Sequence, residues 1–209
     1  MTTSTARIGL LLATFGVLGQ YYLALERAPQ DELSYLGATA RYFSFMTVWT
    51  NVLVILTFLA AAFSNVPKPL QFFRSKSVQA ATAAFILMVG IAYHVLLSSR
   101  FQQTGLNWWT NLLLHYIDPL LYCVWWAFFA EKEPLGFRTA LQWMMFPIVY
   151  FIYSLIRGFI IGWYPYFFVD VNTLGYPQVL LTSAVLLAIY LVFGILVVWI
   201  SRMTSAVKV

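Results

Sequence analysis

The chain has very few charged side chains and only one cysteine. Of its 209 residues, 9% are charged, against about a quarter in soluble globular proteins. So few charges cannot keep the surface of a water-soluble domain hydrated, and a content of 62% hydrophobic residues excludes a disordered chain. The single Cys123 lies within an apolar run, which excludes a disulfide framework and a thiolate metal site. These absences leave an integral membrane protein of one domain.

The excess of basic residues does not indicate a nucleic-acid partner. The net charge is +5, but Lys and Arg are scattered over the breaks between apolar runs and form no basic face. Glycine-rich phosphate loops, CxxC pairs and the HExxH motif are missing, so no cofactor and no metal is assigned. Nothing in the pattern specifies an oligomeric state.

Six apolar runs are each long enough to cross a membrane as a helix, which takes about 20 residues. The runs cover 6–25, 39–63, 78–99, 109–130, 139–162 and 179–201. They are continuous rather than alternating, unlike the strands of a membrane barrel. The sequence therefore predicts an all-α fold class, with a single transmembrane domain over 1–209 built as a polytopic bundle of six helices. The first run is predicted to be a retained helix, because it exceeds a signal-peptide core and no small-residue cleavage site follows it.

Basic residues in the breaks predict the orientation. With six spans, both termini share one side with the second and fourth breaks, and that side holds eight basic residues: Arg7, Lys68, Arg74, Lys76, Lys132, Arg138, Arg202 and Lys208. The other side holds four at most. By the positive-inside rule, the N- and C-termini are predicted to be cytoplasmic.

Four ionisable side chains lie within these runs, namely His94, His115, Asp118 and Arg157. A charged residue at the centre of a span costs about 2.5–3.5 kcal/mol on insertion scales, so such residues are candidates for a functional site. Counting about 1.5 Å per residue from the span ends places all four, together with Thr47, in the outer half of the membrane. This asymmetry predicts a polar pocket that opens toward the outer side.

The spacing of the polar residues adds geometry. Thr47 and Asn51 are four residues apart and His115 and Asp118 are three apart, so each pair shares a helix face. Pro119 frees a backbone carbonyl one turn earlier, near His115, and can open the helix there. Uncharged polar residues in the same runs are Thr50, Tyr93, Thr110 and Asn111.

These residues also have a purely structural interpretation. A Thr in a span commonly bonds the carbonyl four residues back. A membrane His can complete a hydrogen bond between two helices, and Arg157, near a helix end, can extend to the interface.

Three segments have the order and spacing of known membrane proteins: RYFSFMTVWTN at 41–51, NLLLHYIDP at 111–119, and RG at 157–158 followed by GWYPYFFVD at 162–170. Together they resemble a family of small bacterial six-helix membrane proteins of unassigned function. More distantly, they resemble the animal androgen-induced protein family, whose members are multipass threonine hydrolases of fatty acid esters of hydroxy fatty acids. The resemblance covers most of the chain.

The resemblance implies roles for two residues. The nucleophilic threonine of the animal family matches Thr47, which follows an aromatic and an aliphatic residue, and its histidine matches His115, shortly before a proline. That proline comes one position sooner here, and Thr50 or Asn51 stands where the animal proteins have an acidic residue. Ser44 is an alternative match for the threonine. The resemblance further implies a lipid ester of the fatty-acyl class as substrate and a bacterial cell membrane as the location.

The same chemistry follows from the residue types. A hydroxyl nucleophile needs a neighbouring base, which His115 can supply, and Asp118 or another group could orient its ring. Asn51 or Arg157 could donate to a developing oxyanion. We expect Arg157 to point toward this polar cluster or an acidic partner, with Asp170 the first candidate. The predicted function is an intramembrane hydrolase that acts on a lipid ester among membrane lipids.

Two other hypotheses stay open. A non-catalytic membrane protein could bind or transport a lipid or small apolar ligand through Thr47, Asn51, His94 and His115. A proton-linked transporter could use His94, His115, Asp118 and Arg157 as a relay, although no internal repeat or matched pair of broken helices is present. Contact between Thr47 and His115 across one pocket favours the hydrolase.

Overall fold

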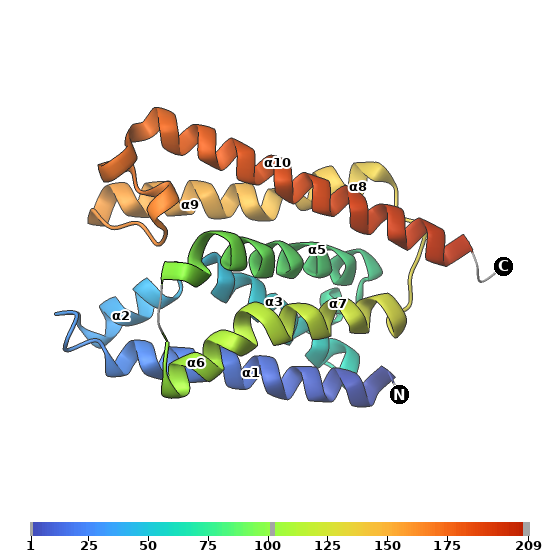
Figure 1. Ribbon diagram of the computed structural model, residues 1–209. Coiled ribbons are helices and arrows are strands. Elements are labelled where there is room, and N and C mark those ends of the chain that lie inside the picture. Colours follow the sequence, from blue (N-terminus) through green and yellow to red (C-terminus); the bar gives the residue numbers. More distant parts are fainter. Residues whose placement is uncertain (1, 101–102, 207–209) are drawn as a thin grey trace.

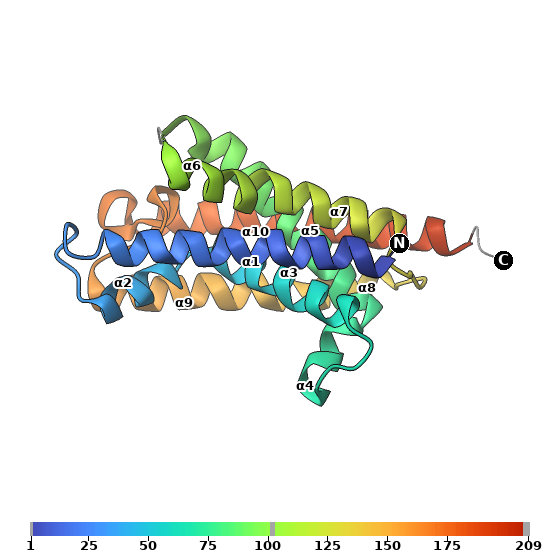
Figure 2. The ribbon, with the colours of Figure 1, turned by 90° about the horizontal axis from the view of Figure 1, so that it is seen from below.

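The structure is a computed structural model that describes residues 2–100 and 103–206. In this part of the chain the secondary structure is entirely helical, without strands, which confirms the all-α class. Most of the long helices lie along one common direction (Figure 1). The start of α1 and the end of α10 lie at the same end of the bundle, and a second view agrees (Figure 2).

The elements follow one another with short connections. The α-helices are α1 (Thr2–Glu26), α2 (Tyr35–Tyr42), α3 (Met46–Ala62), α4 (Lys68–Gln71), α5 (Lys76–Ala92), α6 (Gly105–Leu112), α7 (Asp118–Phe128), α8 (Phe137–Trp143), α9 (Met145–Ile161) and α10 (Val171–Ala206). Two π-helical segments, η2 (Tyr93–Leu97) and η4 (Leu113–Ile117), continue α5 and join α6 to α7. Short 3₁₀ segments are η1 (Phe72–Arg74), η3 (Ser98–Arg100) and η5 (Phe167–Val169).

Four helical stretches are long and apolar enough to cross a membrane: Thr3–Glu26, Lys76–Arg100, Phe137–Ile161 and Val171–Ser205. The pair formed by α2 and α3 gives a fifth candidate if it counts as one span. The run expected at 109–130 forms the continuous helical stretch from α6 to α7, but it is not among these candidates. The fold therefore has four or five candidate spans, as expected of an integral membrane protein, and does not confirm six.

The run at 39–63 was expected to form one helix, and this prediction is wrong. The chain breaks between α2 and α3, which meet at an angle of 76°. The break exposes backbone carbonyls, and side chains satisfy two of them: Trp49 Nε1 donates to the carbonyl of Phe43 at 2.7 Å, and Tyr150 Oη donates to that of Ser44 at 2.9 Å. The break is thus a hydrogen-bonded part of the fold.

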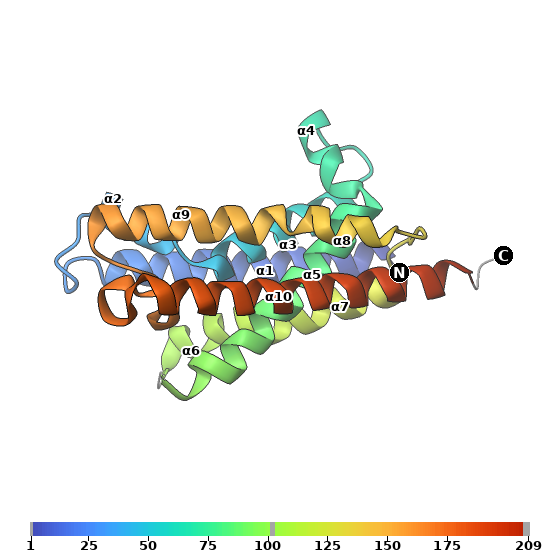
Figure 3. The same ribbon diagram turned by 90° about the horizontal axis from the view of Figure 1, so that it is seen from above.

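Helix α5 forms the centre of the bundle, with α3 and α7 on one side and α10 on the other (Figures 1 and 3). In its most apolar stretch 56% of the residues are buried, against 28–33% in the other three candidate spans. Small residues make this possible, because Ala80, Ala81, Ala83 and Ala84 let neighbouring backbones approach closely.

Gly90, on α5, marks the closest of these approaches. A Cβ at this position would lie 3.0 Å from the backbone oxygen of His115 and 3.2 Å from Cβ of Pro119. The proline ring cannot donate a hydrogen bond to the carbonyl four residues earlier, and that carbonyl belongs to His115. The glycine therefore gives space to the distorted π-helical segment η4.

Candidate functional site

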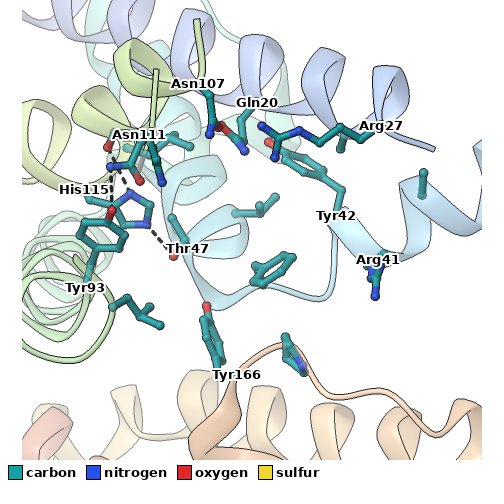
Figure 4. A pocket seen from close by; sticks show the side chains of 18 of the residues that line it. Gln20, Arg27, Arg41, Tyr42, Thr47, Tyr93, Asn107, Asn111, His115 and Tyr166 are labelled. Atoms are coloured by element: carbon teal, nitrogen blue, oxygen red, sulfur yellow. Dashed lines mark hydrogen bonds between the residues drawn. The ribbon is translucent and has the colours of Figure 1, made fainter. Parts of the chain in front are cut away.

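Thr47 and His115 lie within hydrogen-bonding distance although 68 residues separate them in the chain. Oγ1 of Thr47 is 3.3 Å from Nε2 of His115, and Nδ1 of the same ring is 3.1 Å from the backbone oxygen of Asn111 (Figure 4). A carbonyl oxygen only accepts, so Nδ1 holds the ring proton in the neutral imidazole. Nε2 is then free to accept the proton of the Thr47 hydroxyl.

The side chains of Tyr93 and Asn111 hold the His115 ring in place. The ring of Tyr93 stacks on the imidazole with 3.8 Å between centroids and 23° between planes. Nδ2 of Asn111 donates to the Tyr93 hydroxyl at 2.8 Å, and the backbone carbonyl of Asn111 accepts the hydrogen bond from Nδ1 of His115. Asn111 thus fixes both the orientation of His115 and the aromatic ring that covers it.

Thr47 and His115, the dyad, line a cavity of about 500 Å³ (Figure 4). The cavity lies between the end of α1 and α2, at the end of the bundle opposite the start of α1 (Figure 1). Helices α1, α2, α3 and α6, the segments η2 and η4, and the loop before α10 all contribute side chains. Polar or charged groups in the lining are Gln20, Arg27, Asp31, Arg41, Gln103, Asn107 and Asn111. The expected polar pocket is present, and Thr47 and His115 both face it.

The break in the helix determines where Thr47 lies. Thr47 is the second residue of α3, directly after Phe45, which offers no side-chain cap. The sequence-based depth was counted along one continuous helix from residue 39, and that count is wrong because α3 begins at Met46. Thr47 therefore stands at a helix N-terminus inside the bundle, where backbone N–H groups lack partners within the helix.

Tyr166 is a site residue that the sequence analysis did not single out. It lines the large cavity, and it also lines a second, smaller pocket together with Thr47, Tyr93 and Leu97. Its phenol oxygen points toward Thr47 (Figure 4), and the Thr47 hydroxyl and the backbone at Met46 and Thr47 act to lower the pKa of the phenol. Burial raises the pKa of Tyr166 above its usual value, so the phenol keeps its proton. The available signal was the GWYPYF sequence at 162–167.

Asn51 and Thr50 do not reach the cavity. Nδ2 of Asn51 donates to the backbone oxygens of Thr47 at 2.9 Å and Leu114 at 3.2 Å, so it joins α3 to η4 next to the dyad. Its expected role as an oxyanion donor is wrong, because the side chain is fully buried behind Thr47. Thr50 donates to the Met46 carbonyl at 3.0 Å, the structural alternative described above.

Asp118 and His94 are also separated from the dyad. Asp118 is fully buried, and neither carboxyl oxygen has a hydrogen-bond partner in the part of the chain that the structure describes. It does not orient His115, since the Asn111 carbonyl does so. His94 is exposed and its Nδ1 bonds the hydroxyl of Tyr116 at 3.2 Å. The four residues of the hypothetical proton relay are therefore not brought together.

Arg157 was expected to point toward the polar cluster or an acidic partner, and the first candidate for that partner, Asp170, is wrong. The Asp170 carboxylate instead accepts from the backbone N–H of Asn172 at 2.9 Å and from the Thr173 hydroxyl at 3.0 Å, at the start of α10. The guanidinium of Arg157 lies over the Trp163 ring at 5.2 Å, and its Nη1 has no hydrogen-bond partner within the described chain. Ser44, the alternative nucleophile, is fully buried and donates to the Ala40 carbonyl at 2.6 Å.

Other known proteins give no independent information about the site. Over 2–100 and 103–206, no group of three or more His, Cys, Asp or Glu side chains is placed to hold a metal ion. No protein-family model, no curated protein and no solved structure matches the chain. The geometry of the site is therefore the only evidence for its function.

Proposed function

We propose that the chain is an intramembrane hydrolase of a lipid ester of the fatty-acyl class, with Thr47 as nucleophile and His115 as base. The observation that supports this most directly is the 3.3 Å contact between Oγ1 of Thr47 and Nε2 of His115, in a cavity large enough for a ligand. The Asn111 carbonyl leaves Nε2 as the accepting nitrogen, which a general base requires.

The reaction follows the logic of other hydroxyl nucleophiles. His115 takes the proton of Thr47 as Oγ1 attacks the ester carbonyl carbon, and a tetrahedral oxyanion forms. The imidazolium then returns the proton to the leaving alcohol, and an acyl–threonine ester remains. Water, deprotonated by His115, attacks this ester and releases the fatty acid together with free Thr47.

Donors for the oxyanion are available at the start of α3. The backbone at Met46 and Thr47 acts to lower the pKa of the Tyr166 phenol, so the N–H groups without partners at the start of α3 lie close to the phenol oxygen. An ester oxygen that displaces this phenol would accept from these N–H groups, and the protonated Tyr166 could donate a further bond. Backbone donors of this kind commonly supply the oxyanion site in acyl transfer.

The second pocket has a volume of about 50 Å³, so it offers an apolar environment to only the few acyl carbons next to the ester. Apart from Thr47, its lining is entirely apolar or aromatic, drawn from α3, α5, η2, α9, η5, α10 and the loop that contains Tyr166. Because both pockets share Thr47, an ester can place its carbonyl at the nucleophile with hydrocarbon on one side and a polar group on the other.

We place this enzyme in a bacterial cell membrane as a six-span protein with cytoplasmic termini, related to the bacterial and androgen-induced families named above. The sixth span would be the helical stretch from α6 to α7, which is 24 residues long. Its polar side chains Asn107, Asn111 and His115 line the cavity, which explains why this stretch is less apolar than the others.

The test is labelling of the purified protein with a fluorophosphonate probe. The wild type should be labelled, whereas Thr47→Ala should not. Thr50→Ala is the matched control, since Thr50 lies on the same helix with its hydroxyl bonded to a backbone carbonyl. Labelling that persists in Thr47→Ala would reject this nucleophile, and an unlabelled but ligand-binding wild type would support a non-catalytic lipid-binding protein.

A further inference from the structure

We propose that Arg27 and Arg41 form an anion subsite at the mouth of the cavity, which binds the negatively charged end of the substrate. The inference rests on the proposed hydrolase function, and it narrows the substrate to an anionic amphiphile. Its charged group is a carboxylate or a phosphate, two oxyanions that arginine binds in the same way.

The cavity changes in polarity along its length. Figure 4 places Thr47 and His115 at one end of the cavity and Arg27 and Arg41 at the other. Asp31 belongs to the second end, because its carboxylate pairs with Arg41. Figure 4 shows the Arg27 side chain extending back along α1 toward Gln20 and away from the loop that follows. A ligand that fills this space therefore meets cationic groups at one end and the nucleophile at the other.

The two arginines are not equally neutralised. Nη1 of Arg41 is 3.1 Å from the Asp31 carboxylate, and its guanidinium lies over the Trp163 ring at 4.4 Å. The side chain of Arg27 has no hydrogen bond or ion pair with any described residue, although it lines the same cavity. Arg157 lies over the same Trp163 ring at 5.2 Å, so three cations stand near the mouth, against the single carboxylate of Asp31 in the cavity lining.

Helix geometry sets the separation between charge and ester. Gln20 accepts from the Thr110 hydroxyl at 2.7 Å, which fixes α1 beside α6. Arg27 lies about 10 Å beyond Gln20 along α1. His115 lies about 8 Å beyond Thr110 along α6 and η4, which run in the opposite direction. The Arg27 side chain reaches back over part of this span, so the charge lies on the order of 10 Å from the ester. The substrate must have several carbon atoms between the two groups.

The ion pair between Asp31 and Arg41 predicts substitution effects of opposite sign on anion binding. Its carboxylate occupies Arg41 when the cavity holds no ligand, so it competes with the substrate anion. Removing this charge should strengthen anion binding, whereas removing either guanidinium should weaken it. A purely structural role for these residues would not produce opposite signs.

The experiment measures binding of four probes of equal chain length to the full chain in uncharged detergent. The probes are hexadecanoate, hexadecyl phosphate, hexadecanol and hexadecyltrimethylammonium, and calorimetric titration gives the Kd. All variants include Thr47→Ala, so binding does not depend on turnover. Arg138→Gln is the matched control, because Arg138 is an exposed arginine outside the cavity, at the start of α8.

We expect at least one of the two anions to bind about tenfold or more tightly than hexadecanol, because a hydrogen bond to a charged group is worth about 1.5–3 kcal/mol. Arg27→Gln and Arg41→Gln should remove this preference, Asp31→Asn should enlarge it several-fold, and Arg138→Gln should not change it. The stronger anion identifies the source as a fatty acid or a phospholipid. Arg41→Lys keeps the positive charge and should keep most of the preference, which separates loss of charge from any loss of stability in Arg41→Gln.

Two results would overturn the subsite: equal Kd values for the anions and hexadecanol, or an anion preference that survives both arginine substitutions. Neither result affects the labelling of Thr47. Conversely, an arginine-dependent preference in a protein that the fluorophosphonate probe never labels would reject the hydrolase and leave the anion site standing. The two failures are therefore distinguishable.

Discussion

The π-helical segments η2 and η4 make an instructive pair, because each contains a tyrosine and a histidine in reversed order. Tyr93 and His94 lie in η2, and His115 and Tyr116 lie in η4. Each tyrosine contacts the histidine of the other segment: Tyr93 stacks on His115 at 3.8 Å, and the Tyr116 hydroxyl bonds Nδ1 of His94 at 3.2 Å. Similar residues in similar segments thus form two crossed pairs.

The two pairs differ in what surrounds the imidazole. His115 is half-buried, with one nitrogen on a backbone carbonyl and the other on a hydroxyl. His94 is exposed, and it does not line the cavity. An imidazole inside a span is therefore a candidate base only when one nitrogen is fixed and the other faces a nucleophile. Substitutions can test this difference, beginning with the largest expected effect.

Removing either member of the dyad should have the largest effect. Thr47→Ala and His115→Ala should each lower ester hydrolysis by at least about a thousandfold, as in other nucleophile–base pairs. Because they act as one unit, the double variant should be no slower than the single ones. Rates on a 4-nitrophenyl ester measure this, with Tm as the control for folding. If the rate of the double variant fell by the product of the two single-variant losses, Thr47 and His115 would act independently, which would contradict the proposed pair.

Gly90→Ala should have the second largest effect, since it acts on η4 from outside the cavity. The added Cβ would lie 3.0 Å from the backbone oxygen of His115, so α5 or η4 must shift. We expect turnover to fall about tenfold and the protein to lose about 1–3 kcal/mol of stability, a range typical of overpacking. Gly136→Ala is the control, because a Cβ there meets no atom within 4 Å. Equal behaviour of the two variants would mean that the close approach is unimportant.

Tyr93→Phe should have a smaller effect, because it keeps the ring that stacks on His115. The variant loses only the hydrogen bond from Asn111, which is worth about 1 kcal/mol. We expect kcat to fall about fivefold with little change in KM. Tyr93→Ala, which removes the stack as well, should be clearly worse. If the two variants had equal kcat values, the ring would have no part in positioning His115.

His94→Ala should have the smallest effect, less than about twofold on kcat and within about 0.5 kcal/mol in stability, as for other exposed positions. The companion variant Tyr116→Phe removes the same hydrogen bond from the other side. Steady-state rates of both are compared with those of His115→Ala. A large loss of kcat in His94→Ala would show that the two π-helical segments are functionally equivalent, contrary to the difference between their histidines.

The sequence predicted the helical class and the partners in the dyad, because both depend on strong local signals. Long apolar runs define helices. Thr47 and His115 stood out as polar groups within such runs, although the depth counted for Thr47 was wrong. The break between α2 and α3 was not predicted, since no glycine or proline marks it. Side chains distant in sequence, such as Tyr150, satisfy its carbonyls.

The supporting residues were harder to predict because distant contacts determine their roles. Asp118 shares a helix face with His115, yet a backbone carbonyl on the preceding turn orients the ring. Arg157 and Asp170 have opposite charges, but Asp170 bonds Asn172 and Thr173 locally at the start of α10. Tyr166 reaches the dyad from a loop, a position that helix periodicity cannot indicate.

The break between α2 and α3 has an electrostatic consequence. A helix that crossed the membrane without interruption would place its N-terminal end near the polar headgroups, but α3 begins at Met46, beside the cavity. The aligned peptide units of a helix produce a macrodipole equivalent to about half a positive charge at that end. Thr47 lies there, so negative charge that develops on its oxygen or on a bound ester is stabilised without an ionised side chain. In an environment of low dielectric constant, such a partial charge acts over a longer distance than it would in water.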